Sequence, residues 1–208
     1  SMPRLTPLAA ADFTFITVAF GSVTVISGLW KSLPAGARLI VVDNGPPDGM
    51  EIWAGENGVL YLPMSANVGF GAACNEGAKH ANTEWLFFIN PDVLFLEDSI
   101  DRLILGISRS PNTLGFGPVM IDAFGVRSFK RRSKLSPIRV PKVSAEANFP
   151  VPFLSGAALV MKRTAFEAIG GFDPGIFLYF EDDDISIRFT KLFGSFILIP
   201  DFELIHLG

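Results

Sequence analysis

A chain of 208 residues is long enough for one domain with a substantial buried core, and we expect a single domain over residues 1–208. The composition, with 49% hydrophobic residues, 18% charged residues and 20 phenylalanines, is typical of a protein built around a largely buried sheet. A net charge of −4 argues against general nucleic-acid binding, and a single cysteine, Cys74, excludes an intramolecular disulfide.

The uncharged run from Phe13 to Trp30 has the length of a membrane-spanning helix but not its composition. Threonine, serine and glycine recur along it, so we expect a buried strand, a turn and the start of a helix instead. Arg4 is the one positive charge before this run, so a signal peptide is not expected. The lone cysteine agrees with a reducing compartment, and we expect a cytoplasmic location.

Apolar segments of strand length alternate with helical segments along the chain. The expected strands are Phe13–Ala19, Arg38–Val42, Val59–Leu62, Trp85–Ile89, Leu114–Ile121, Ser155–Met161 and Phe196–Ile199. The expected helices are Val23–Leu33, Ala72–Ala81, Glu97–Ser108, a short helix with a Thr164–Glu167 capping box, and a helix from near Asp182 to Phe193. This alternation predicts an α/β fold with a mainly parallel central sheet and helices on both faces.

A basic segment interrupts this pattern between Arg127 and Lys142. It holds seven basic residues, no acidic residue, and two prolines. We expect a flexible basic loop over about residues 122–152, between a nucleotide-binding half (about 13–121) and an acceptor and catalytic half (about 153–208). The loop is either a solvated surface insertion or a flap that contacts phosphates or an anionic acceptor.

Four consecutive carboxylates, Glu181 to Asp184, follow the apolar segment Phe177-Leu178-Tyr179-Phe180. One interpretation is the acidic first turn of a helix, where negative charge is favourable. The other is a partly buried group at the rim of a pocket, where repulsion and desolvation increase the affinity for protons or cations. In the second case the cluster is suited to act as a general base or to lie near a metal.

Polar loops follow three of the expected strands, where an open α/β sheet binds its ligands. They are Asp43-Asn44, the segment from Asn67 to Gly71, and Asn90-Pro91-Asp92. Asp92 is a plausible ligand for Mg²⁺ or Mn²⁺, which prefer oxygen, and His206 could add a nitrogen ligand to Mn²⁺ or be purely structural. The sequence has no Gly-Lys-Ser tripeptide and no Gly-x-Gly-x-x-Gly, which disfavours a P-loop protein and a dinucleotide dehydrogenase.

The order of these motifs resembles glycosyltransferase family 2, whose members have the fold called GT-A. The resemblance covers about residues 13–208. It rests on Val41-Val42-Asp43-Asn44 with Asp48-Gly49, Asn67-Val68-Gly69-Phe70-Gly71 with Asn75-Glu76-Gly77, Asn90-Pro91-Asp92, Ser155-Gly156-Ala157, Gly170-Gly171-Phe172-Asp173, Glu181-Asp182-Asp183-Asp184 and His206.

The resemblance implies an inverting glycosyltransferase in which Asp182 deprotonates the acceptor hydroxyl, with Glu181 and Asp184 as the alternative bases. It implies a Mg²⁺ or Mn²⁺ ion at Asp92 and His206, which would stabilise the leaving diphosphate. The implied nucleotide-binding residues are Ala19, Asp43, Asn44, Asn67, Gly69, Asn75 and Asn90.

Two positions depart from the family pattern. The first strand usually continues into Tyr-Asn-Ser, and here it continues into Phe20-Gly21-Ser22. Asn90 stands in place of the first aspartate of the metal motif, a form shared with rhamnosyltransferase-like members. The resemblance therefore implies a dTDP- or UDP-sugar donor, a saccharide or lipid-linked saccharide acceptor, a role in cell-surface polysaccharide synthesis, and peripheral contact with the inner face of the membrane.

Three other functions can be compared with the sequence, and it disfavours the second and the third. An inactive nucleotide-sugar-binding domain would explain the altered Phe20-Gly21 corner. A nucleotidyltransferase would need a basic glycine-rich loop near the first strand, which the segment from Phe20 to Ser27 lacks. An acidic calcium module would need EF-hand spacing around Asp182, which is absent from the sequence.

Overall fold

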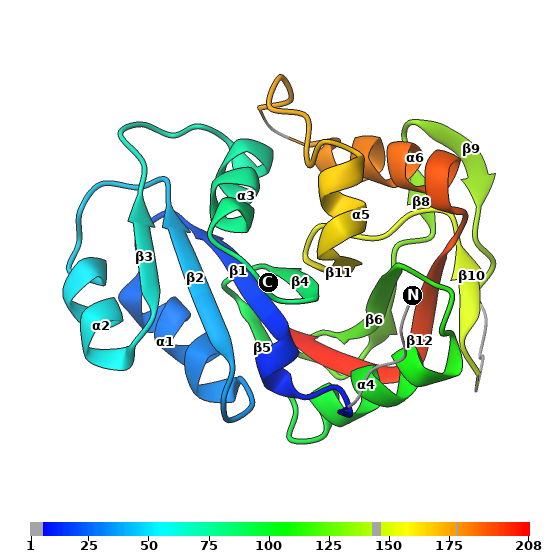
Figure 1. Cartoon of the computed structure of the whole chain (residues 1–208), viewed down its shortest axis with the longest axis horizontal. Helices are drawn as coiled ribbons and strands as arrows, with labels where there is room; N and C mark the ends of the chain where they lie inside the picture. Colours follow the sequence, from blue (N-terminus) through cyan, green and yellow to red (C-terminus); the bar gives the residue numbers. More distant parts are fainter. Residues whose placement is uncertain (1–5, 143–146, 178) are drawn as a thin grey trace.

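The computed structural model describes residues 6–142, 147–177 and 179–208, so Arg4 and Leu178 lie outside the described residues. A curved central sheet carries helices on both faces (Figure 1). This confirms the predicted α/β fold class.

The sheet is mixed, and most strands of its main path share one direction. Its order is β10-β12-β6-β11-β4-β1-β2-β3. On this path β1 pairs in parallel with β2 and β4, β2 with β3, and β6 with β12, whereas β11 and β10 run antiparallel to their neighbours. The strands are β1 Phe13–Ala19, β2 Arg38–Asp43, β3 Leu60–Pro63, β4 Trp85–Ile89, β6 Gly115–Ile121, β10 Phe149–Val151, β11 Ala158–Lys162 and β12 Phe196–His206.

Two shorter strands pair with strands of this sheet, and two others form a small sheet of their own. β5 (Val93–Phe95) pairs with β12, and β7 (Arg127–Ser128) pairs with β6. β8 (Arg132–Ser133) and β9 (Ser136–Arg139) form a separate two-stranded sheet, which we call the basic hairpin. A 3₁₀ turn, Ala10–Asp12, precedes β1.

The helices divide between two apolar cores, one on each face of the sheet. Buried side chains of α1 (Val23–Ser32), α2 (Met50–Asn57) and α4 (Ser99–Arg109) belong to the first core. Those of α3 (Phe70–Lys79), α5 (Arg163–Ala168) and α6 (Glu181–Phe193) belong to the second, and these helices lie above the sheet in Figure 1.

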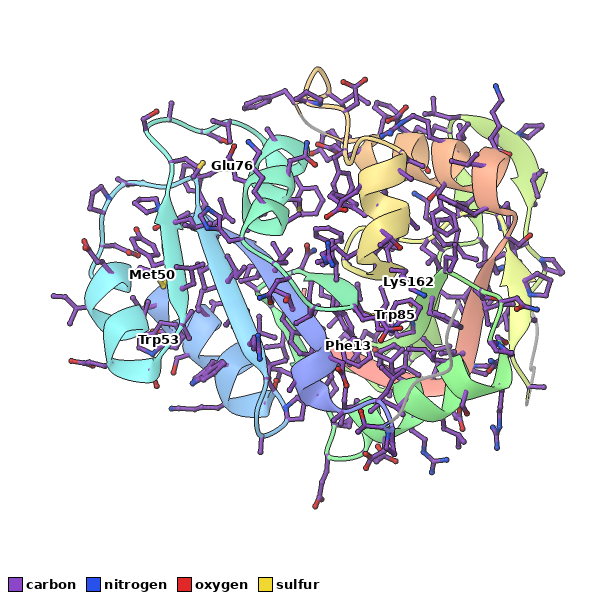
Figure 2. The ribbon with its side chains drawn as sticks, viewed as in Figure 1. Phe13, Met50, Trp53, Glu76, Trp85 and Lys162 are labelled. Atoms are coloured by element: carbon purple, nitrogen blue, oxygen red, sulfur yellow. The ribbon has the colours of Figure 1, made fainter. Side chains whose placement is uncertain are left out.

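Side-chain alternation explains why the central strands are apolar throughout. In β1, Phe13 and Phe15 enter the first core, and Ile16 enters the second. Phe13 lies opposite Trp85 of β4, and their rings stack with centroids 6.4 Å apart (Figure 2). Burial on both faces leaves little room for polar residues in these strands.

The expected elements are largely confirmed. β1 and β4 have the predicted bounds, and α1, α4 and β6 differ from their predictions by one or two residues. The run from Phe13 to Trp30 forms β1, a turn and α1. None of the helices in the described ranges has the length and apolar character needed to cross a bilayer.

Several details of the prediction were wrong. The last strand continues through Pro200 to His206, because a register shift between Leu198 and Glu203 lets β12 resume pairing with β6. The Thr164–Glu167 capping box is absent, since α5 begins at Arg163 and its N-cap, Lys162, makes no side-chain capping bond. The basic segment contains β7, β8 and β9 rather than only loop, and α2 and β5 were not foreseen.

Candidate active site

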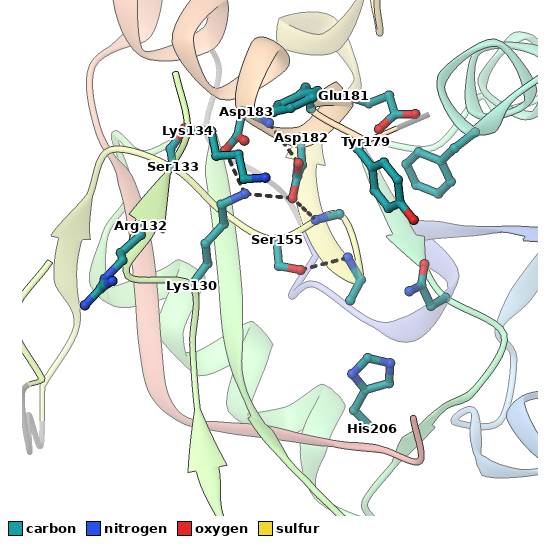
Figure 3. Close-up of a pocket in the computed structure, with 15 residues that line it drawn as sticks. Lys130, Arg132, Ser133, Lys134, Ser155, Tyr179, Glu181, Asp182, Asp183 and His206 are labelled. Atoms are coloured by element: carbon teal, nitrogen blue, oxygen red, sulfur yellow. Dashed lines mark hydrogen bonds and ion pairs between the residues drawn. The ribbon is translucent and has the colours of Figure 1, made fainter. Parts of the chain in front are cut away.

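A cavity of about 890 Å³ lies where the acidic start of α6 faces the basic hairpin (Figure 3). Its walls come from segments far apart in the sequence, and its floor includes the residue after β4 and the end of β12. The lining residues are Phe70, Asn90, Lys130, Arg132, Ser133, Lys134, Ser155, Gly156, Ala157, Tyr179, Phe180, Glu181, Asp182, Asp183 and His206.

Asp182 is held in place from two directions. Its Oδ2 accepts hydrogen bonds from the Gly156 backbone N–H at 3.1 Å and from Lys130 Nζ at 3.0 Å. The side chain lies in the first turn of α6, where the helix dipole favours negative charge. It is 23% exposed, so a ligand in the cavity can reach the carboxylate.

Lys130 joins two of the carboxylates. Its Nζ also lies 2.7 Å from Asp183 Oδ1, and the Asp183 side chain is buried. Burial lowers the pKa of Lys130, but the hydrogen bond to Asp183 and the charge of Asp182 outweigh it and raise the pKa overall. Lys130 therefore stays charged and offsets the repulsion between the two carboxylates.

Glu181 has a different environment on the same turn. It is buried, and among the described residues its Oε1 has no hydrogen-bond partner. Burial raises the pKa of Glu181, its own backbone N–H partly opposes this, and the charge of Asp182 raises the pKa further. Glu181 thus binds a proton more tightly than a solvated glutamate does.

Asp184 faces away from the cavity. Its Oδ2 accepts hydrogen bonds from Arg188 Nη2 at 2.8 Å and Nε at 3.0 Å. The third Arg188 nitrogen donates to the Ile169 carbonyl at 2.8 Å, which fixes the pair against the end of α5. Of the four consecutive carboxylates, Glu181, Asp182 and Asp183 line the cavity and Asp184 does not.

The structure brings Asp92 and His206 together at the rim. His206 Nε2 lies 3.2 Å from Asp92 Oδ2, and both side chains are about one-third exposed, at 34% and 29%. The contact follows from the fold, because β12 pairs with β5 so that His206 lies opposite Val93, next to Asp92 in the chain.

This pair is compatible with a divalent cation that takes its remaining ligands from substrate and water. Two ligand atoms at right angles around an octahedral ion, each about 2.1 Å from it, lie about 3 Å apart. The Nε2–Oδ2 separation is close to that value. Within the described residues no group of three or more His, Cys, Asp or Glu side chains could hold a metal ion.

Asp43 is enclosed rather than open to a ligand. It is fully buried, and its Oδ1 accepts from the backbone N–H groups of Gly45 (2.9 Å) and Gly21 (3.3 Å). Its Oδ2 accepts from the Tyr61 hydroxyl at 2.8 Å. Burial, the hydrogen bond to Asp43 and nearby negative charges raise the pKa of Tyr61 to about 12. Asp43 therefore ties together the loops that follow β1 and β2.

A second set of bonds ties the β2 end to the loop before α3. The Asn44 backbone N–H donates to the Ala19 carbonyl at 2.8 Å, and Asn44 Nδ2 donates to the Gly69 carbonyl at 3.2 Å. Asn67 Oδ1 accepts from the Gly69 N–H at 3.0 Å. Gly69 has φ +87°, and a Cβ there would lie 2.7 Å from the Phe177 carbonyl, so only glycine fits this close approach.

Asn75 binds protein backbone away from the main cavity. Its Oδ1 accepts from the Phe172 N–H and its Nδ2 donates to the Phe172 carbonyl, both at 2.9 Å. It lies in a smaller depression together with Gly171. This arrangement fastens α3 to the segment between α5 and α6.

The predicted site residues thus fall into groups. Asn90, Glu181, Asp182 and His206 line the main cavity, and Asp92 contacts His206 at its rim. The structure does not put the remaining predicted residues in the lining: Ala19, Asp43, Asn44, Asn67, Gly69, Asn75 and Asp184.

The sequence did not predict which basic residues of the basic segment line the cavity; we call these residues, Lys130, Arg132 and Lys134, the basic wall. Lys130, Arg132 and Lys134 line the cavity, whereas Arg131 turns away and donates to the Val140 carbonyl at 2.9 Å. Ser133 lines the cavity between Arg132 and Lys134, so the usable signal in the sequence was the concentration of basic residues and not their spacing.

Comparison with known proteins gives consistent matches in sequence. The family model described as "Glycosyl transferase family 2" matches residues 14–170. An N-acetylglucosaminyl-diphospho-decaprenol L-rhamnosyltransferase of Mycobacterium tuberculosis is 31% identical over 201 residues, covering 81% of this chain and 66% of the relative. Rhamnosyltransferase WbbL of Escherichia coli is 23% identical over 149 residues, covering 65% of this chain and 56% of the relative. The chain thus spans less than two-thirds of the length of these relatives.

Solved structures agree on the fold. A crystal structure of GalNAc-T7 with UDP, GalNAc and Mn²⁺ superimposes with a TM-score of 0.77 at 16% identity, covering 94% of this chain and 44% of that chain. A crystal structure of S. aureus TarS residues 1–349 gives a TM-score of 0.73 at 16% identity, covering 94% of this chain and 60% of that chain. At this identity the likeness concerns the fold.

Proposed function

Because this chain belongs to glycosyl transferase family 2, we propose that it transfers a sugar from a nucleoside-diphosphate donor to an acceptor hydroxyl with inversion. The observation that carries the proposal is Asp182, a partly exposed carboxylate fixed at the wall of a large cavity that His206 also lines. Such a carboxylate can accept a proton from an acceptor hydroxyl as that hydroxyl attacks the anomeric carbon.

Asp182 is favoured as the base over its neighbours for physical reasons. Asp184 is occupied by Arg188, and Asp183 is buried against Lys130. Glu181 is buried, and its raised pKa makes the protonated form more accessible. A protonated Glu181 would donate a hydrogen bond to a substrate oxygen rather than accept a proton.

The donor diphosphate is proposed to lie on the His206 side of the cavity. Asp92 and His206 would hold a Mg²⁺ or Mn²⁺ ion there, and this ion would neutralise charge on the leaving nucleoside diphosphate. Asn90, which lines the cavity after β4, would contact the nucleotide. Asp43, Asn44 and Gly69 would act by shaping the loops that the nucleotide meets.

Two of the sequence relatives are named as rhamnosyltransferases, which supports a rhamnosyl donor, and we propose dTDP-rhamnose, with a UDP-sugar as the alternative. The acceptor would be a saccharide or a lipid-linked saccharide in cell-surface polysaccharide synthesis. Work on such an acceptor would take place in the cytoplasm at the inner face of the membrane.

Calorimetric titration of dTDP and UDP, each with and without Mn²⁺ or Mg²⁺, tests the donor side. Binding that depends on the cation supports the proposal, and the preferred base identifies the donor nucleotide. Absence of nucleotide binding under all of these conditions would contradict it. Release of nucleoside diphosphate only when acceptor is added separates an active transferase from an inactive nucleotide-sugar-binding domain.

A further inference from the structure

Lys130 is the residue of the basic wall that contacts the proposed base. Its side chain is only 19% exposed, and its Nζ lies 3.0 Å from Asp182 Oδ2 and 2.7 Å from Asp183 Oδ1 (Figure 3). Among the described residues nothing else hydrogen-bonds to this buried Asp183 oxygen. One ammonium therefore bridges two carboxylates in the first turn of α6.

The residues on both sides of Lys130 are themselves anchored to the fold. The Phe129 ring packs edge-on against that of Phe149 in β10, with centroids 5.6 Å apart. The Val140 N–H donates to the Arg131 carbonyl, and Arg131 Nε donates to the Val140 carbonyl, both at 2.9 Å. The backbone at Lys130 is thus fastened before and after this residue, and supporting contacts of this kind hold a functional side chain in one geometry.

The two oxygens of Asp182 have different partners. Oδ2 accepts hydrogen bonds from Lys130 Nζ at 3.0 Å and from the Gly156 N–H at 3.1 Å. In the described ranges Oδ1 accepts from one donor, the Asp183 N–H, at 2.9 Å. A carboxylate oxygen has two lone pairs, so both pairs of Oδ2 are engaged and one pair of Oδ1 is left for a ligand in the cavity.

This division of partners also fits the state that follows proton transfer. When a proton is on Oδ1, Oδ2 becomes the carbonyl oxygen of a carboxylic acid, and a carbonyl oxygen keeps both of its hydrogen bonds. Asp183 shares the Lys130 ammonium, so the positive charge is still balanced by a carboxylate when Asp182 becomes neutral. The arrangement around Lys130 therefore need not change during the reaction.

We propose that Lys130 is a positioning residue: its ammonium, bound to Asp182 Oδ2 and Asp183 Oδ1, orients the Asp182 carboxylate so that Oδ1 receives the acceptor proton. This inference rests on the proposed function and adds a role within the same site. In the transfer step the acceptor O–H bond breaks and an Oδ1–H bond forms, while the acceptor oxygen bonds to the anomeric carbon. The bond from that carbon to the donor phosphate breaks, and its electron pair leaves with the nucleoside diphosphate.

Hydrolysis of the donor tests this role without the natural acceptor, because water takes the place of the acceptor hydroxyl. Release of dTDP from dTDP-rhamnose, and of UDP from UDP-glucose, is followed with Mn²⁺ in the unsubstituted chain and in Lys130→Met. This change keeps the length of the side chain and removes its charge. Misplacing a reacting group by about 1 Å costs about 100-fold in rate, so kcat should fall by about that factor while KM for the donor stays within about twofold.

Lys142→Met is the matched control, because Lys142 is an exposed lysine of the same basic segment and lies outside the cavity lining. Its kcat should stay within about twofold of the original. An equal loss in both variants would mean that the segment acts through its overall charge, and would overturn the proposal. Unchanged or faster turnover by Lys130→Met would overturn it too, since the ammonium would then be dispensable or would block the base.

A charge-balanced variant separates positioning from stability. Lys130→Met alone leaves two carboxylates without their shared cation, which also destabilises the fold. Lys130→Met combined with Asp183→Asn removes one positive and one negative charge together, so the net charge of the cluster is unchanged. Its thermal unfolding midpoint should be close to that of the original chain, and its kcat should be as low as that of Lys130→Met. Full activity of this double variant would mean that Lys130 only neutralises Asp183.

Rescue by an added amine gives a readout that a purely structural role would not move. Propylammonium has the three carbons and the ammonium that Lys130→Ala removes, and the cavity gives it access to the vacated position. It should restore part of the lost rate in a saturable manner, whereas sodium at the same ionic strength should not. Equal effects of the two cations would contradict the positioning role.

Failure of this inference and failure of the proposed function give different results. If the unsubstituted chain binds dTDP or UDP with Mn²⁺ and hydrolyses the donor, and Lys130→Met does so equally well, the inference about Lys130 alone is wrong. If the unsubstituted chain binds no nucleotide, the proposed function fails and the role of Lys130 fails with it. Nucleotide binding without hydrolysis of either donor favours the inactive nucleotide-sugar-binding domain and overturns both.

Discussion

Asp182 and Asp184 are two residues apart in the first turn of α6, and their carboxylates meet different partners. Asp182 opens to the cavity, whereas Asp184 is paired with Arg188 outside it. We expect Asp182→Asn to lower the transfer rate by about 10²- to 10⁴-fold, because the amide cannot accept the acceptor proton. Nucleotide binding should stay within about twofold, as calorimetry would measure.

Asp184→Asn is the matched control for this change. It removes the same charge from the same helix turn, so any general effect on the α6 dipole is shared by both variants. Activity should stay within a few-fold of the original, with a stability loss of about 1 kcal/mol from the partly buried ion pair. Full turnover by Asp182→Asn together with an inactive Asp184→Asn would transfer the role of base to Asp184.

The raised pKa of Tyr61 predicts how the stability of the fold depends on pH. The Tyr61 hydroxyl donates to the buried Asp43, and its pKa is raised from 10.0 to about 12. A raised folded-state pKa means that the stabilisation from this phenol is complete below pH 10 and is lost as the pH rises through about 12. The chain holds two tyrosines, so an absorbance titration of phenolate should show a phase near pH 12 that disappears in Tyr61→Phe.

The same substitution also tests how Asp43 is held. Tyr61→Phe leaves a buried carboxylate oxygen without this partner and should cost about 1–3 kcal/mol of unfolding free energy at pH 7. Urea denaturation of both forms at pH 7 measures the difference. No phase near pH 12 in the native chain, together with unchanged stability, would mean that the Tyr61–Asp43 hydrogen bond does not form in solution.

At the scale of elements, the Asn75 side chain hydrogen-bonds α3 to the chain before α6. Asn75 makes two hydrogen bonds of 2.9 Å to the Phe172 backbone. Asn75→Ala should therefore lower the unfolding free energy by about 2 kcal/mol, since both backbone groups lose their partner. Glu76→Ala is the control, because it removes only the exposed pair with Lys79 and should change stability by less than about 0.5 kcal/mol.

Nucleotide affinity of Asn75→Ala distinguishes two roles for this residue. The resemblance to the family implies that Asn75 contacts the nucleotide, whereas the structure shows it bonded to protein backbone outside the main cavity. We expect dTDP affinity to change by less than about twofold. A loss of tenfold or more, at unchanged stability, would favour the nucleotide role.

The sequence predicted elements best where burial left few alternatives. β1 and β4 are buried along almost their whole length, and polar residues mark their ends, Asp12 before β1, Glu84 before β4 and Asn90 after it, so their bounds were predicted correctly. β12 was cut short at Pro200 because proline usually ends a strand, and a register shift that accommodates it depends on pairing with β6 and β5. The predicted Thr164–Glu167 capping box is absent because the Glu167 side chain pairs with Arg163 instead. Arg163 lies one residue before the expected N-cap, Thr164.

The whole molecule determines which polar loops meet, and that information is not local. The sequence could predict that Asn90 and Asp92 follow a strand and that carboxylates begin α6. It could not predict that Lys130 reaches Asp182 across 52 residues of sequence, because that contact depends on where the basic hairpin folds back. The composition of the segment predicted a basic loop, but not which of its residues enter the cavity.

Asp92 and His206 offer the prediction that depends most on the assembled fold. Asp92 lies in the turn between β4 and β5, His206 ends β12, and the pairing of β12 with β5 brings their side chains to 3.2 Å. If they hold one cation together, Asp92→Ala and His206→Ala should each reduce the Mn²⁺-dependent gain in dTDP affinity by about tenfold or more. Because both variants lose the same ion, the double variant should be little worse than either single one, which is non-additive behaviour.

His80→Ala completes the experiment as a control. His80 is the other histidine of the chain, and it caps α3 on the exposed surface, outside the cavity lining. Its removal should leave the Mn²⁺ effect intact. Additive losses from Asp92→Ala and His206→Ala would mean that the two side chains act separately, His206 on the diphosphate itself and Asp92 elsewhere. Unchanged affinity in both variants, with and without Mn²⁺, would remove the cation from this edge of the sheet.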